Sequence, residues 1–215
     1  MKQIFLMIIL AGMSLMPMAA AQPDGQDKAL EVLEQKNSSR KAFYGNFKQT
    51  KTLVSKKEIK SEGTLYFSAP DKLSMLYTSP EGEKMIINGD TMLNEREGKN
   101  NKFDLTKNKP MQTLAATILY SMQGKISELA KICNADINTV QNASGWTVTL
   151  TAKTKAAKGY SSIVLAYKSD GTICSMEMTE FSGISTLYEM DSITTGIPDE
   201  NVFYIRASSH SKRAE

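Results

Sequence analysis

The stretch GTLYFSAPDKLSMLYTSPEGEKMIINGDTMLN, residues 63–94, contains four short extended runs separated by turn signals. The turn signals are, in chain order, Pro70-Asp71, SPEGE and Asn88-Gly89-Asp90. Asn-Gly tolerates the positive φ angles of a tight hairpin. In the second run Leu73, Met75 and Tyr77 share one face. Because strand side chains point alternately to opposite faces, this stretch predicts consecutive antiparallel strands that share one apolar face.

The same period of two continues on both sides of this stretch. Upstream, Phe43, Gly45, Phe47 and Gln49 share one parity, and Leu65 lies between Gly63 and Phe67 on one face of the next run. The further strands that the pattern predicts are 43–54, 58–68, 146–153, 161–168, 172–183, 185–196 and 201–207. The chain is therefore expected to be mainly β, in the α+β class.

Two segments have the helical period instead. Residues 24–39 carry a short apolar stripe, and residues 110–133 repeat apolar residues every three or four positions, with Gly124 predicted to divide them into two helices. A long antiparallel sheet could curl around this second segment. If the segment fills the hollow permanently, the hollow is only a core, and if the segment can lift, the hollow is a lipid site.

The 13 Met residues favour the second possibility as a set, because Met adapts to varied apolar shapes. For any single Met, ordinary core packing is the better explanation.

The N-terminal residues have the pattern of a secretory signal peptide. A basic start is followed by an apolar run and an Ala-x-Ala site, which places cleavage after Ala21. A membrane anchor is the alternative, but Gly12, Ser14 and Pro17 interrupt a run that is already short for a span of ~20 residues. We expect a signal peptide at 1–21, one domain at 22–207 and a polar tail at 208–215.

Several function classes find no support in the sequence. The lysines are scattered and the formal net charge is +3, so nucleic acid is not an expected partner. The only His, His210, lies in the polar tail, and there is no nucleophile motif, metal-ligand cluster or phosphate-binding loop. We expect neither an enzyme nor a cofactor or metal site. Cys133 and Cys174 form a disulfide or remain two separate thiols, and the sequence leaves both open.

A series of short motifs resembles one family. NFKQTK, the opening stretch, SDGTI and the terminal VFYI follow in the order found in the periplasmic lipoprotein carriers of the Lol system, the LolA-like family. The resemblance covers essentially the whole chain after the signal peptide. It implies a half-open antiparallel β-barrel, a strongly curved sheet lidded by helices, whose hollow takes the acyl chains of lipoproteins.

The resemblance also implies a role and partners. A carrier of this family is a periplasmic monomer that receives acylated lipoproteins from an inner-membrane release complex and passes them to an outer-membrane acceptor. A lipid- or lipopeptide-binding sensor or adaptor of the same fold is the alternative. The family's Arg before the Pro of its turn, which ties the lid shut, is replaced here by Ala69.

By parity with the family, one set of side chains is expected to face the hollow. These residues are Phe47, Leu65, Phe67, Leu73, Met75, Tyr77, Ile86, Met92, Leu114, Ile118 and Met122.

Overall fold

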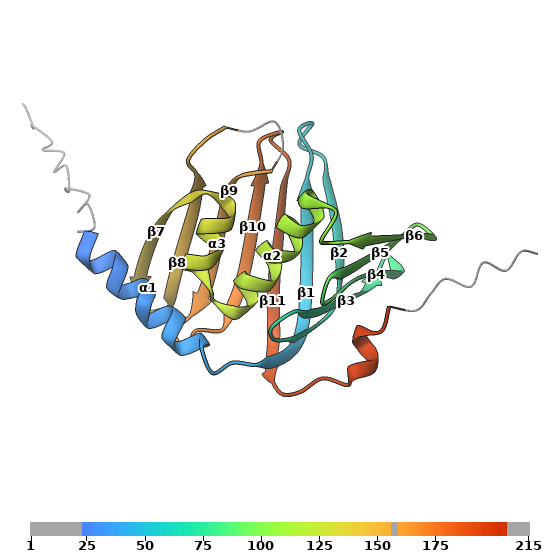
Figure 1. Ribbon diagram of the computed structural model, residues 1–215, viewed down its shortest axis with the longest axis horizontal. Coiled ribbons are helices and arrows are strands. Elements are labelled where there is room, and N and C mark those ends of the chain that lie inside the picture. Colours follow the sequence, from blue (N-terminus) through green and yellow to red (C-terminus); the bar gives the residue numbers. More distant parts are fainter. Residues whose placement is uncertain (1–22, 156–158, 206–215) are drawn as a thin grey trace, which may run out of the picture.

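The computed structural model describes residues 23–155 and 159–205 (Figure 1). The predicted signal peptide at 1–21 and the tail at 208–215, with His210, lie outside the described residues. The strands are β1 (Ala42–Thr52), β2 (Glu58–Ser68), β3 (Lys72–Ser79), β4 (Glu81–Asn88), β5 (Thr91–Arg96), β6 (Lys99–Asp104), β7 (Ala135–Asn142), β8 (Gly145–Ala152), β9 (Tyr160–Lys168), β10 (Ile173–Glu180) and β11 (Ser185–Thr195). The helices are α1 (Pro23–Asn37), α2 (Lys109–Gln123), α3 (Ile126–Cys133) and the 3-10 helix η1 (Glu200–Phe203).

The strands form one antiparallel sheet in the order β6-β5-β4-β3-β2-β1-β11-β10-β9-β8-β7. Strands that follow one another in the chain are neighbours in the sheet, except that β6 and β7 lie at its opposite edges. At the centre of the sheet β1 pairs with β11. The sheet is strongly curved and does not close into a barrel, since β6 and β7 remain its two edges. Figure 1 shows β3 to β6 running at a steep angle to β7 to β11. The predicted half-open architecture is confirmed.

Two helices, α2 and α3, lie across the inner face of this sheet, and we call them the helical lid (Figure 1). The Asn108 side chain accepts a hydrogen bond from the Met111 amide and starts α2. Gly124 ends α2 at a φ of 65°, where a Cβ atom would lie 2.8 Å from the Asn37 side chain. Only glycine fits both demands, so the predicted break at Gly124 is confirmed.

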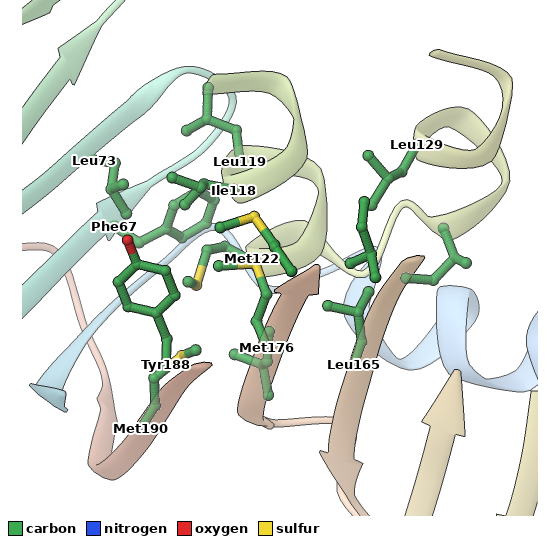
Figure 2. Close-up of a cluster of buried hydrophobic side chains, with 14 of the residues drawn as sticks. Phe67, Leu73, Ile118, Leu119, Met122, Leu129, Leu165, Met176, Tyr188 and Met190 are labelled. Atoms are coloured by element: carbon green, nitrogen blue, oxygen red, sulfur yellow. The ribbon is translucent and has the colours of Figure 1, made fainter. Parts of the chain in front are cut away.

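The core lies between the helical lid and the inner face of the sheet. Figure 2 shows Ile118 and Met122 of α2 pointing toward Phe67 of β2, Met176 of β10 and Leu165 of β9. All five side chains are at most 2% exposed. The helical lid therefore fills the hollow in this structure, and its apolar stripe is the inner layer of the core.

Two elements differ from the sequence expectation. Residues 135–142 form the edge strand β7, which the sequence did not predict, and the expected strand at 201–207 is instead the helix η1 where the structure describes it. The Asp199 carboxylate accepts from the Asn201 amide and starts this helical turn.

The helix η1 covers the outer face of β3 and β4, away from the helical lid (Figure 1). Phe203 is 1% exposed there, and its carbonyl accepts a hydrogen bond from Asn88 Nδ2 at 3.2 Å. Lys72 Nζ lies 2.7 Å from a Glu200 carboxylate oxygen and 6.0 Å from the Phe203 ring centroid. This part of the sheet is consequently buried on both faces.

Candidate functional site

The structure brings together almost all of the residues predicted to face the hollow. Tyr77 and Leu114 are half-buried and pack against the inner core. The predicted residues that are fully part of this core are Phe47, Leu65, Phe67, Leu73, Met75, Met92, Ile118 and Met122. They come from β1, β2, β3, β5 and α2.

Ile86 is the exception, and its predicted orientation is wrong by one residue. In the β3–β4 ladder Leu73 pairs with Ile87 and Met75 with Met85, so Met85 and Ile87 share the inner face. Ile86 pairs with Ser74 and with Leu93. These three residues lie on the outer face, where η1 covers the sheet.

Gly63 allows two inner-face rings to meet across a strand. It lies between Phe47 of β1 and Tyr77 of β3 in the ladders. The two ring centroids are 5.1 Å apart in an edge-to-face arrangement, the favoured geometry for an aromatic pair. A Cβ atom at Gly63 would lie 2.1 Å from the Leu76 carbonyl oxygen, so the position requires glycine.

A cavity of about 330 Å³ enters the inner core beside the first turns of α2. Its apolar lining is rich in methionine and comprises Met85, Met92, Phe103, Met111, Leu114 and Met178. Flexible thioether side chains can repack around ligands of different shape. The volume lies at the small end of the usual range for ligand pockets, so a ligand with several acyl chains requires the helical lid to move.

Three tyrosines, Tyr77, Tyr160 and Tyr188, line the cavity. Tyr77 donates a hydrogen bond to Gln49 Oε1 at 2.8 Å. Burial raises the pKa of Tyr188 to about 12 and also raises the pKa values of Tyr77 and Tyr160, in each case mainly because the charged form loses its hydration. These hydroxyls therefore stay neutral at physiological pH.

The helical lid is held at the C-terminal end of α2 by neutral hydrogen bonds. Gln123 is 7% exposed, and its Nε2 donates to the Pro70 carbonyl at 2.9 Å and to the Leu119 carbonyl at 3.0 Å. Tyr167 of β9 donates to the Ser121 carbonyl at 2.8 Å. Gln123 thus reaches the turn at which Ala69 replaces the expected arginine, which identifies a lid contact that the sequence did not reveal.

The two cysteines are free thiols in different surroundings, so the structure does not pair them. Cys133 Sγ lies 3.9 Å from Thr117 Oγ1 inside the helical lid, whereas Cys174 Sγ lies 3.3 Å from the Ala166 carbonyl in the sheet. Burial raises the pKa of both thiols.

Within residues 23–155 and 159–205 no group of three or more His, Cys, Asp or Glu side chains is placed to bind a metal ion. None of the helices in that described part combines the length and apolar character needed to cross a bilayer.

Sequence reasoning missed part of the inner face contributed by the C-terminal half. Tyr167, Met176, Met178, Tyr188 and Met190 all belong to the inner core. Their alternation within 161–168, 172–183 and 185–196 carried the necessary signal, since each pair of neighbours on a strand face is two residues apart.

The family described as outer membrane lipoprotein carrier protein LolA matches residues 38–206. A LolA superfamily protein from Nitrosomonas europaea is 10% identical with a TM-score of 0.41, over 84% of this chain and 97% of that chain. A putative outer membrane lipoprotein-sorting protein domain from Vibrio parahaemolyticus is 12% identical with a TM-score of 0.43, over 82% and 94%. MucB in complex with MucA(peri) is 14% identical with a TM-score of 0.43, over 85% and 60%. No curated protein matches the chain significantly.

Proposed function

Because the chain belongs to the LolA family of outer membrane lipoprotein carrier proteins, we propose that it binds the acyl chains of lipoproteins in the hollow under its helical lid and carries them across the periplasm. The cargo would come from a release complex in the inner membrane and pass to an acceptor at the outer membrane. The signal-peptide pattern at the N-terminus supports export.

One observation carries this proposal. A single amphipathic segment, α2 and α3, covers the apolar inner face of a sheet that stays open at both edges. The short loops at 105–108 and 134 join this segment to β6 and β7, and the β-ladders do not depend on it. The helical lid can therefore leave the inner face while the sheet keeps its hydrogen bonds.

The energetics of an acyl chain fit such an exchange. Each methylene group removed from water contributes about 0.8 kcal/mol, so a lipoprotein anchor needs an apolar cover to cross an aqueous compartment. In the carrier, acyl chains would replace Ile118 and Met122 against the sheet. One apolar surface replaces another, which keeps the net affinity moderate and permits release.

Native mass spectrometry of the protein purified from its own cell envelope tests the proposal. A mixed set of acylated lipoproteins supports a carrier. A single lipid species or one stably bound protein partner would instead indicate a sensor or adaptor of the same fold. A protein that is isolated empty and also refuses added lipoprotein would show that the hollow is only a core.

A matched pair of variants locates the binding site. Leu114 is half-buried and lines the cavity, while Gln112 is exposed on the same helix. Leu114→Glu should abolish acyl binding because it places a carboxylate beside the chains, and Gln112→Glu should not. Equal binding by both variants would exclude this cavity as the entrance.

A further inference from the structure

The inner face of the sheet changes from apolar to polar toward one end, as the strands β1, β4 and β10 show. On β1 Phe47 is followed by Gln49, and on β10 Met178 is followed by Glu180. On β4 Met85 is preceded by Glu83, because that strand runs in the opposite direction. These polar side chains line the same cavity as the methionines, and we call them the collar and the apolar part of the lining the floor. The collar comprises Gln49, Ser61, Glu83, Asn94, Arg96 and Glu180.

The charges around the collar balance. Glu83 and Glu180 oppose Arg96 and the neighbouring Lys51, two carboxylates against two cations. Arg96 Nε lies 3.4 Å from a Glu83 carboxylate oxygen. The Arg96 side chain is 43% exposed and that of Glu83 only 12%, so the pair extends from solvent into the cavity. With no net positive charge, the collar offers a phosphate group no net electrostatic attraction to repay the loss of its hydration.

The uncharged members of the collar are suited to a different kind of head group. Ser61 is 8% exposed, and Gln49 has its oxygen occupied by the Tyr77 hydroxyl, which leaves its amide NH₂ to donate. Asn94 offers both a donor and an acceptor. Ester and amide groups, which combine carbonyl acceptors with N–H donors, match this set.

We propose that the collar is a head-group site, which binds the ester and amide groups joining acyl chains to a peptide and discriminates against lipids with an anionic phosphate head. This rests on the proposed function, since it names the chemical class of ligand taken by the same cavity. Acyl chains alone would be held without selection by the methionine-rich floor. The collar would supply the preference for an acylated peptide over the phospholipids that surround it in a membrane.

Displacement of a fluorescent fatty acid from the purified protein tests this, with two competitors that carry identical palmitoyl chains. One is a dipalmitoyl-glyceryl cysteine lipopeptide with blocked termini and no charged residues, and the other is dipalmitoyl phosphatidylglycerol. We expect the lipopeptide to displace the probe at a concentration at least about tenfold lower. Glu83→Gln and Glu180→Gln should reduce this preference, because each removes a carboxylate and so strengthens binding of the phospholipid. Glu189→Gln, at an exposed position on the outer face of β11, should leave it unchanged.

The outcomes separate this inference from the function on which it rests. Equal displacement by both competitors, or a stronger effect of the phospholipid, would overturn the head-group site while leaving acyl binding intact. An unchanged preference in both glutamate variants would also overturn it. A protein that takes up neither the fluorescent fatty acid nor the competitors would refute the proposed function itself.

Discussion

Gly63 shows how one missing side chain shapes the inner face. A Cβ atom there would meet the Leu76 carbonyl at 2.1 Å and would separate the paired rings of Phe47 and Tyr77. Gly63→Ala should lower the free energy of unfolding by about 1–3 kcal/mol, as overpacking in a core does. Urea unfolding measures this. Gly25→Ala is the control, because nothing lies within 4 Å of that position, and it should be neutral or stabilising.

Gln123 is the residue that we expect to set how readily the helical lid opens. Its donation to the Pro70 carbonyl joins α2 to the β2–β3 turn, and a net hydrogen bond of this kind contributes about 1 kcal/mol. Gln123→Leu should therefore speed hydrogen exchange of the α2 amides about fivefold. Gln112→Leu, on the exposed side of the same helix, is the control. Unchanged hydrogen exchange of the α2 amides in Gln123→Leu would show that another contact holds the helical lid closed.

Tyr188 predicts a pH dependence of stability. Burial raises its pKa to about 12 in the folded protein, whereas an unfolded tyrosine titrates near 10. Between these values the unfolded chain has lost the proton and the folded chain retains it, so its contribution to stability is complete below pH 10 and declines as the pH rises toward 12. The unfolding free energy of the native protein, relative to that of Tyr188→Phe, should fall by up to about 3 kcal/mol in this range. Urea unfolding at several pH values measures it.

The matched control for Tyr188 is Tyr44→Phe on the outer face, where Tyr44 is 40% exposed. A constant difference between the native protein and Tyr188→Phe from pH 9 to 12 would contradict the assignment of Tyr188 to a desolvated cavity wall.

At the scale of elements, the sequence predicted the strands and helices in which the apolar period is clear. Within 63–68 and 72–78 the residues Leu65, Phe67, Leu73, Met75 and Tyr77 share one parity, and the ladders place them on the inner face. The strand β7 escaped prediction because ADINTVQN has only Ala135, Ile137 and Val140 as apolar residues, and Val140 is exposed. An edge strand with one neighbour needs few apolar residues, so its pattern is weak.

The run Met85-Ile86-Ile87 explains the one site residue that was placed on the wrong face. Three consecutive apolar residues have no parity, and the strand is buried on both sides because η1 packs outside it. The sequence suggested a strand where η1 forms, so nothing indicated that the outer face was covered. A site residue can be assigned by alternation only where the other face of the strand is polar.

The helix η1 should contribute to stability without contributing to binding. Phe203→Ala removes a ring that is 1% exposed and should cost about 3–5 kcal/mol of unfolding free energy. Acyl affinity, measured where the variant is still folded, should equal that of the native protein because Phe203 lies outside the inner core. Tyr204→Ala, at 65% exposure, is the neighbouring control. Loss of binding in folded Phe203→Ala would link the two faces of the sheet.

At the scale of the whole molecule, we expect the open sheet to provide stability and the inserted helical lid to control access to the cavity. The β1–β2 and β1–β11 ladders at the centre of the sheet hold the curvature, and the cavity of about 330 Å³ is too small for several acyl chains. If the proposed function holds, acyl chains must therefore take the volume occupied by Ile118 and Met122.

Hydrogen exchange with and without a bound triacyl lipopeptide checks this division. Loading should increase exchange in α2 and α3, because helices that leave their apolar support are only marginally stable. Amides of β1, β2 and β11 should be unaffected or better protected, since their ladders persist and their inner face stays covered by the acyl chains. If α2 remains as protected in the loaded protein as in the empty one, the acyl chains enter without displacing the helical lid. The filled inner core would then be a permanent part of the fold.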